Sequence, residues 1–185
     1  MKFKSYIIIS LLLAIASDAT AQTGIITDPL LFVYKLHGQT RKYQYTFTPS
    51  ADSMTLSWGI ERNTKWQSGT FTITGKALRE GNRMSFAQPI DGEHVTLPDN
   101  ESYLLISQKA FDSLKNNGRL TYNDTEYRAT GDTVSRDGMQ LIHVHDDAEG
   151  CDMWILDRRD FPVVWEMSNN PLEINWSVSY TPQNR

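Results

Sequence analysis

Alternation of apolar and polar residues constrains the fold of this chain more than any other feature. In KYQYTF, residues 42–47, the aromatic residues Tyr43, Tyr45 and Phe47 take every second position and polar residues take the others. EINWSVSY, residues 173–180, repeats this pattern. Successive side chains of a β-strand point to opposite faces, so such segments bury one face and expose the other. The pattern is typical of antiparallel sheets, because parallel sheets are usually covered on both faces.

Turn-forming residues separate these segments. Clusters of Asp, Asn, Gly and Pro recur along the chain, for example in TPSADS (48–53) and SNNP (168–171), and their backbone preferences suit tight turns. The runs between them predict roughly ten to twelve short strands. SQKAFDSLKNNG, residues 107–118, predicts one helix, because Ser107 can cap its start and Gly118 its end. We therefore expect a mainly β fold, a curved antiparallel sheet or half-barrel with one short helix packed on it.

The first residues predict export. Two lysines give a positive start, an apolar run follows over residues 7–16, and Ala-Thr-Ala at 19–21 offers the small residues that signal peptidase recognises. The apolar run is shorter than the about 20 residues that a spanning helix needs, so residues 1–21 are predicted to be a cleaved signal peptide. Residues 22–185 are then predicted to form a single β-rich domain without a transmembrane segment.

Charge and cysteine content exclude several classes of protein. The formal net charge is −4 and no cluster of Lys and Arg occurs in the sequence, which argues against binding to nucleic acid. Cys151 is the only cysteine, so no disulfide can form within the chain. No motif of a cysteine enzyme surrounds it, and we expect a half-buried thiol on a strand rather than a nucleophile or a metal ligand.

One segment concentrates groups that could carry chemistry. LIHVHDDAEGCDMW, residues 141–154, holds His143, His145, four carboxylates and the cysteine. On a strand both imidazoles would lie on one face, and such a pair can bind zinc if a third ligand is near. The alternative is a β-hairpin whose acids form the turn and whose histidines end an exposed strand face. The surroundings favour the hairpin, and the sequence contains no motif of a known hydrolase.

Aromatic residues supply the candidate ligand-binding surface. The candidates are Tyr43, Tyr45, Trp58, Trp66, Trp165 and Trp176. Most aromatic residues sit on the apolar side of their predicted strands, where they either fill the core or line a concave pocket. Trp66 stands in the polar context NTKWQSG and is the best candidate for an exposed aromatic.

The C-terminal third, MWILDRRDFPVVWEMSNNPLEINWSVSY (153–180), combines a strand, an acidic turn with Phe-Pro, an apolar strand and a final alternating strand. Together with YLLISQKAFDSLK (103–115), it resembles uncharacterised exported β-rich proteins of Gram-negative bacteria. It is loosely similar to the periplasmic lipoprotein-carrier superfamily, in which an antiparallel half-barrel wraps around helices. The resemblance implies binding of acyl chains without catalysis, in the periplasm or at the cell surface of such a bacterium. It implies no role for any individual residue.

These observations predict a non-catalytic binding or carrier module of the cell envelope, with an apolar or amphiphilic (lipid-like) ligand. Such a module requires an unfilled cavity of about 300 Å³ or more on the concave face. One alternative is a small metal-dependent hydrolase centred on His143 and His145. Another is an envelope scaffold or protein-interaction domain that uses a sheet edge or an aromatic patch. No cofactor is expected, and the protein partner is left open.

Overall fold

Antiparallel β-strands make up most of the molecule. The computed structural model describes residues 26–180. Eleven strands form one sheet in the order β6-β4-β3-β2-β1-β13-β12-β11-β10-β9-β8, and β5 and β7 form a separate pair. The predicted signal peptide, residues 1–21, lies outside the described residues. The buried side chains of the described residues form one hydrophobic cluster.

The strands range from two to twelve residues in length and follow one another along most of the chain. In chain order they are β1 (Leu30–Leu36), β2 (Gln39–Ser50), β3 (Ser53–Arg62), β4 (Lys65–Thr74), β5 (Arg83–Met84), β6 (His94–Thr96), β7 (Glu101–Ser102), β8 (Arg119–Tyr122), β9 (Thr125–Arg136), β10 (Met139–His145), β11 (Asp152–Leu156), β12 (Val164–Ser168) and β13 (Ile174–Ser179). Neighbours in the large sheet are antiparallel except β4 and β6, which pair in parallel at one edge.

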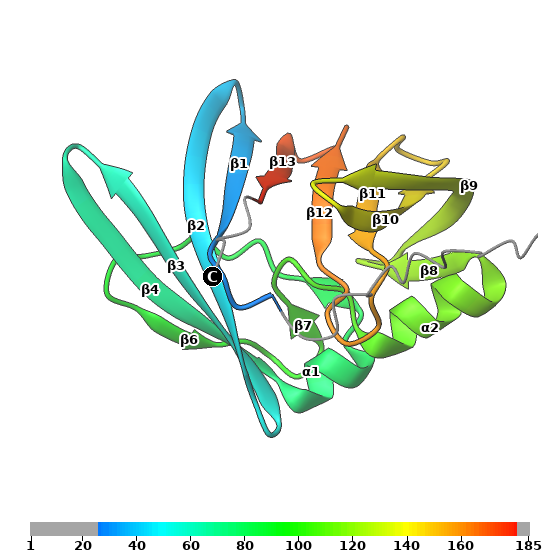
Figure 1. Ribbon diagram of the computed structural model, residues 1–185, viewed down its shortest axis with the longest axis horizontal. Helices are drawn as coiled ribbons and strands as arrows, with labels where there is room; N and C mark the ends of the chain where they lie inside the picture. Colours follow the sequence, from blue (N-terminus) through cyan, green and yellow to red (C-terminus); the bar gives the residue numbers. More distant parts are fainter. Residues whose placement is uncertain (1–25, 181–185) are drawn as a thin grey trace, which may run out of the picture.

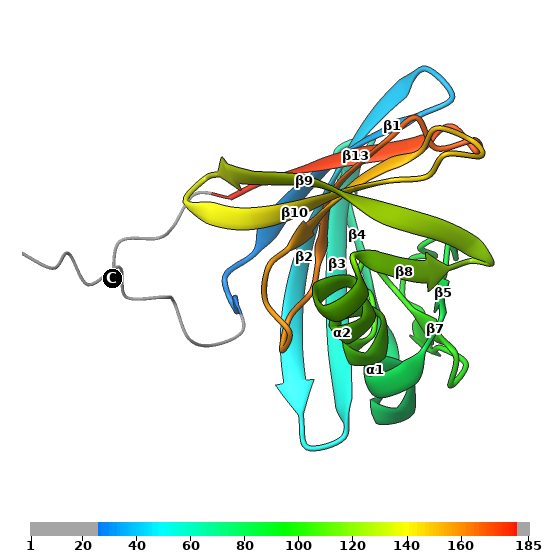
Figure 2. The same ribbon diagram turned by 90° about the vertical axis from the view of Figure 1, so that its right-hand side faces the viewer.

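The large sheet is strongly curved and stays open. Figure 1 shows β1 to β4 on one side of the molecule and β8 to β12 on the other. In Figure 2, turned by 90°, β9 and β10 cross the direction of β2 and β3 at a steep angle. The strands β6 and β8 remain as its two edges. The prediction of a mainly β fold with a curved antiparallel sheet is therefore confirmed.

The concave face of the sheet carries the core, as the alternation predicts. In β2, Tyr43, Tyr45 and Phe47 are buried, whereas the residues between them are exposed or half-buried. In β3, Met54 and Leu56 follow the same pattern. Full burial of such a side chain contributes roughly 1.5–3 kcal/mol, so a shift of one residue in strand pairing would lose several such contributions at once.

Two helices, rather than the single one expected, pack at one end of the concave face (Figures 1 and 2). The predicted helix is α2 (Gln108–Asn117). The Ser107 hydroxyl accepts a hydrogen bond of 3.3 Å from the first turn, and Gly118, with φ 67°, ends the helix. The buried face of α2 includes Phe111 and Leu114, and the helix packs against β8.

The second helix, α1 (Gly75–Glu80), has no clear signal in the sequence. Its six residues make fewer than two turns, too few to show a helical spacing of apolar residues. The hydroxyl of Thr74 caps it by accepting a hydrogen bond of 3.2 Å from the backbone of Ala77. Within residues 26–180, neither helix is long and apolar enough to cross a membrane.

Residues 81–107, here called the cover segment, run from α1 to α2. They include the edge strand β6, and their other parts lie over part of the concave face. Tyr103 of this segment stacks on Phe71 of β4, with ring centroids 4.5 Å apart, and lies 6.2 Å from the ring of Tyr45. Leu105 forms an isolated bridge with Val163, just before β12. The cover segment is thus fixed to both sides of the curved sheet.

Candidate ligand-binding site

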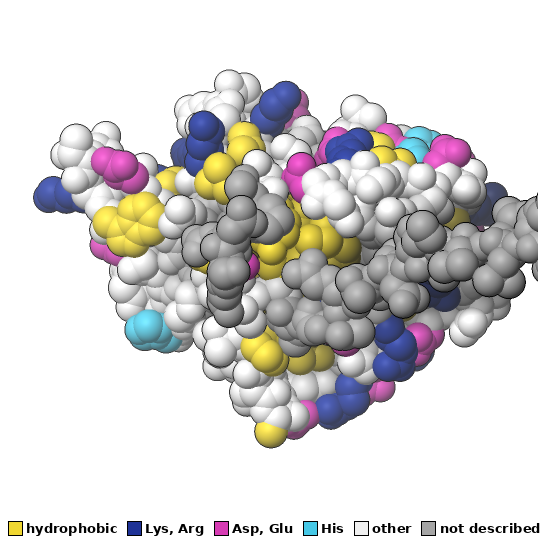
Figure 3. Space-filling view, viewed as in Figure 1, with side chains coloured by type: hydrophobic (Ala, Val, Ile, Leu, Met, Phe, Trp, Pro, Cys, Tyr) yellow, Lys and Arg dark blue, Asp and Glu magenta, His cyan; other side chains and the backbone are white. Residues whose placement is uncertain are grey.

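A cavity of about 340 Å³ lies between the large sheet and the cover segment. One wall is formed by side chains of β1, β2 and β13, and the other by residues 84–89, Tyr103 and Leu104. In the space-filling view of Figure 3, hydrophobic side chains are visible in the middle of the molecule, between the two groups of strands seen in Figure 1. The concave face is therefore only partly filled by its own side chains.

Aromatic side chains from three neighbouring strands form the sheet wall of the cavity. Tyr34 of β1 lies opposite Trp176 of β13 in the strand register, and their ring centroids are 5.8 Å apart. Tyr34 also contacts Tyr43 and Tyr45 of β2, at 5.6 and 6.5 Å. Because residues two apart share a face of a strand, Tyr43 and Tyr45 lie side by side and stack. Strand pairing therefore builds a continuous aromatic surface.

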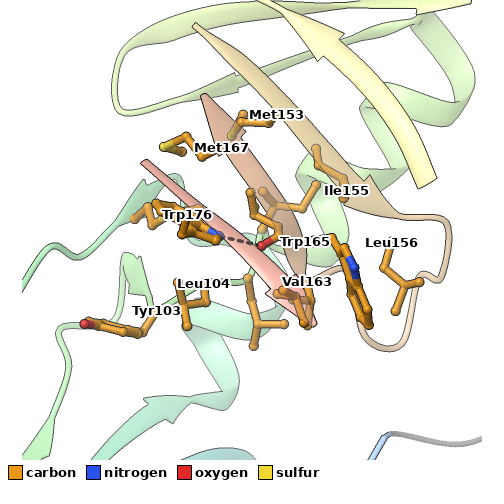
Figure 4. Close-up of a cluster of buried hydrophobic side chains, with 14 of the residues drawn as sticks. Tyr103, Leu104, Met153, Ile155, Leu156, Val163, Trp165, Met167 and Trp176 are labelled. Atoms are coloured by element: carbon orange, nitrogen blue, oxygen red, sulfur yellow. Dashed lines mark hydrogen bonds between the residues drawn. The ribbon is translucent and has the colours of Figure 1, made fainter. Parts of the chain in front are cut away.

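The indole of Trp176 has a fixed orientation in this wall. Its Nε1 donates a hydrogen bond of 2.9 Å to the carbonyl of Val164, drawn as a dashed line in Figure 4. That bond satisfies the only polar atom of the ring. The ring itself is then available as apolar surface next to Leu104 of the cover segment (Figure 4).

Three phenol hydroxyls at the cavity, those of Tyr34, Tyr45 and Tyr103, stay neutral. Burial raises the pKa values of Tyr34 and Tyr45 well above the usual value for tyrosine. It also raises the pKa of Tyr103, to about 12. The hydroxyls of Tyr34 and Tyr45 lie 3.3 Å apart, and Tyr103 donates to the carbonyl of Ala87 at 3.2 Å. At neutral pH these groups can form hydrogen bonds with a ligand but cannot take a proton from it.

The cover segment holds Leu104 in an unusual backbone conformation. Its φ of 61° lies in the left-handed region, which costs a branched residue about 1–3 kcal/mol. The carbonyl of Leu104 accepts a hydrogen bond of 2.8 Å from Val164, and the bridge between Leu105 and Val163 follows directly. These bonds offset the strain and fix the turn that places Tyr103 and Leu104 on the cavity.

Three of the six aromatic candidates line this cavity, namely Tyr43, Tyr45 and Trp176. Trp58 is buried next to Tyr43, with ring centroids 6.3 Å apart, and does not line it. Trp165 is also buried, and Figure 4 shows it beside Leu156, away from Trp176.

Trp66 lies apart from the cavity, on the outer face of the sheet. Its side chain is 59% exposed and covers Gly59 of the neighbouring strand. A single exposed tryptophan is not a binding surface by itself. Trp66 is therefore separated from the other five aromatic candidates, which all lie on the inner side.

Tyr34, Tyr103, Arg41 and Arg62 also line the cavity and were not among the candidate binding residues. Arg41 lies two residues before Tyr43 and so extends the inward-facing series of β2. Arg62 extends the inward-facing series of β3 in the same way, at the end of that strand. Extending each period-2 series to its polar end would have placed both arginines on the concave face. Tyr103 lies in the irregular cover segment, where periodicity gives no signal.

The segment from 141 to 154 forms the β10–β11 hairpin, in agreement with the favoured interpretation. Asp146 accepts hydrogen bonds from the backbone of Ala148 (2.8 Å) and Glu149 (3.1 Å) and so shapes the turn. Cys151 lies directly before β11 and is fully buried rather than half-buried. Burial raises the pKa of its thiol to about 11, so the reactive thiolate is scarce at neutral pH.

The two histidines of this hairpin converge on one carboxylate. His143 Nε2 and His145 Nδ1 lie 2.8 and 2.9 Å from the same oxygen, Oδ1 of Asp152. Asn169 donates to Oδ2 at 3.2 Å. Burial raises the pKa of Asp152, but the hydrogen bonds from both histidines and Asn169 outweigh it and hold that pKa below its usual value.

His143 has further contacts that restrain its ring. It stacks on Trp154 with ring centroids 4.5 Å apart, and its Nδ1 lies 3.1 Å from the hydroxyl of Thr130. Among residues 26–180, no group of three or more His, Cys, Asp and Glu side chains has an arrangement that could hold a metal ion. Metal binding by His143 and His145 stays a prediction.

The carboxylate of Asp152 is expected to stabilise the hairpin above its unfolded pKa of about 3.9 and to lose this effect as the pH falls through its lower folded pKa. Asp152→Asn should therefore lower the free energy of unfolding by about 1 kcal/mol at pH 6 and by less below pH 4. Urea unfolding of the wild-type and variant proteins, at pH 6 and below pH 4, measures this loss of stability under each condition. Asp147→Asn, at an exposed neighbouring carboxylate, is the control and should change little. An Asp152→Asn loss that is equal at both pH values would contradict the assignment.

Comparison of the chain with protein-family models, with curated proteins and with solved structures found no significant match in any of the three.

Proposed function

We propose that this protein is an exported, non-catalytic binding or carrier protein of the cell envelope, which holds an apolar or amphiphilic ligand on its concave face. The observation that carries the proposal is the cavity of about 340 Å³ between the sheet and the cover segment. Pockets for small molecules usually have volumes of about 300–1,000 Å³. The export part of the proposal depends on the sequence of residues 1–21.

The chemistry of the wall supports binding rather than catalysis. Aromatic rings offer large apolar area at a small cost in side-chain entropy, which suits contacts with hydrocarbon or ring-shaped ligands. The phenols of Tyr34, Tyr45 and Tyr103 keep their protons because burial raises the pKa of each. They suit hydrogen bonding to a polar end of the ligand better than acid–base chemistry on it.

The proposal is tested by binding of N-phenyl-1-naphthylamine, a neutral apolar dye that becomes fluorescent in apolar sites. The purified protein should bind the dye saturably. Ile174→Trp should weaken binding by about tenfold or more, because Ile174 lines the cavity and the larger indole would fill it. Leu172→Trp adds the same indole at a position that is 54% exposed, outside the cavity, and should bind like the unchanged protein.

Circular dichroism of both variants shows whether the fold is kept. Saturable binding that Ile174→Trp leaves unchanged would place the dye elsewhere and count against the proposal. A wild-type protein that does not bind the dye would contradict the proposal directly.

A further inference from the structure

The described residues that line the cavity include basic side chains but no acidic ones. Arg41, Arg62 and His37 are the ionisable residues with basic side chains that line it, and no Asp or Glu is among the described lining residues. The chain as a whole has a formal net charge of −4. From this composition one would expect acidic side chains among the residues that line the cavity. The nearest acidic group to His37 is Glu173, whose Oε2 lies 3.0 Å from His37 Nδ1.

The two arginines at this cavity are also exceptional among the arginines of the protein. Residues 26–180 contain nine arginines. Seven of them form an ion pair with Asp or Glu: Arg79, Arg83, Arg119, Arg128, Arg136, Arg158 and Arg159. Arg41 and Arg62 are the two without a described carboxylate partner, and both line the same cavity.

Neutral groups hold these guanidinium groups in place. Arg62 donates a hydrogen bond of 3.3 Å to the hydroxyl of Tyr43, and Arg41 donates one of 3.2 Å to the side-chain oxygen of Gln39. Both arginines are half-buried. A guanidinium group has five N–H donors, so these single bonds leave several donors on each arginine for a further acceptor.

The strand register orders the cavity from apolar to charged. Along β2, the inner face runs from Phe47 through Tyr45 and Tyr43 to Arg41. Tyr34 lies opposite Arg41 on the neighbouring strand β1. One end of the wall is therefore aromatic and the other cationic, an arrangement that matches a molecule with an apolar body and one anionic end.

We infer that the ligand of this cavity is an anionic amphiphile, whose apolar body lies on the aromatic wall and whose carboxylate or phosphate is bound by Arg41 and Arg62. This inference rests on the proposed function and narrows it to one class of ligand. Arginine suits the role because its planar guanidinium can donate two parallel hydrogen bonds to a carboxylate or a phosphate.

The test compares ligands that share a ten-carbon chain and differ in the end group: decanoate, decyl phosphate and decanol, each used below its micellar concentration to displace the dye. The wild-type protein should bind at least one of the two anions about tenfold or more tighter than decanol. The double variant Arg41→Gln, Arg62→Gln should lose this preference and still bind decanol, which also shows that it is folded. The tighter of the two anions identifies the end group.

Arg79→Gln is the matched control, since Arg79 pairs with Asp52 at α1 and does not line the cavity. It should keep the preference for the anion. Equal binding of all three compounds by the wild-type protein, or a preference that survives the double variant, would overturn the inference and leave the proposed function standing. Binding of the dye without displacement by any of the three compounds would overturn the inference alone, whereas a wild-type protein that binds neither the dye nor the compounds would overturn both.

Discussion

Replacing Phe161 with alanine is expected to lower the free energy of unfolding by about 3–5 kcal/mol. Phe161 lies in the turn between β11 and β12 and is fully buried. Its ring meets that of Phe47 on β2 edge to face, at 4.9 Å between centroids and 83° between planes. Three strands separate β2 from β11 in the sheet order, so this contact joins distant parts of the curved sheet across its concave side.

The loss should appear as a melting temperature lowered by about 6–20 °C, since 1 kcal/mol corresponds to about 2–4 °C in a domain of this size. Phe161→Leu should recover part of it, because leucine keeps apolar volume but not the ring contact. Trp66→Ala is the control for loss of an exposed aromatic side chain and should cost less than about 1 kcal/mol. A Phe161→Ala protein as stable as the Trp66→Ala protein would show that the contact does not hold the sheet in its curved form.

The sequence predicts those parts of the fold that depend on local pattern. The alternation in residues 42–47 and 173–180 identifies strands and their buried faces, because every second residue must face the same side. The helix expected over 107–118 is found as α2, since its caps at Ser107 and Gly118 are local signals. The short helix α1 is not predicted, because its six residues are too few to show the helical spacing of apolar residues.

The cavity could not be predicted, because it depends on contacts between segments far apart in the chain. Tyr34 and Trp176 are neighbours only through the pairing of β1 with β13. The sequence predicts both Trp165 and Trp176 to be aromatic residues of β-strands. In the structure Trp165 lies beside Leu156 in the core, whereas Trp176 lines the cavity. Period 2 can place Arg41 and Arg62 on the concave face, but the fold is needed to bring both to one cavity.

The histidine pair shows the same limit on a smaller scale. The spacing of His143 and His145 predicts that they share a face, and both do contact one oxygen of Asp152. The spacing could not show which of the four nearby carboxylates they would meet. That choice is made by the β10–β11 pairing, in which His145 lies directly opposite Asp152.

Gly69→Ala is expected to lower the free energy of unfolding by about 1–3 kcal/mol, because the added methyl group has no space. A Cβ at Gly69 would lie 2.5 Å from the carbonyl oxygen of Glu93 and 2.8 Å from the ring of Trp58. The same carbonyl accepts a hydrogen bond of 2.9 Å from Thr70, which holds the edge strand β6 against β4. The backbone at Glu93 cannot move away without weakening this bond.

Gly59→Ala is the matched control, because Gly59 lies in the adjacent strand but on the outer face. The three atoms nearest to a Cβ there all belong to the ring of Trp66, an exposed side chain that can rotate away, so the cost should stay below about 1 kcal/mol. Thermal unfolding ranks the two variants, and faster hydrogen exchange at Thr70 in Gly69→Ala alone would locate the damage at the β4–β6 edge. Equal losses in both variants would show that the close approach of Glu93 adds no cost at Gly69. A larger loss at Gly69 would show that the close approach of residue 93 requires glycine there.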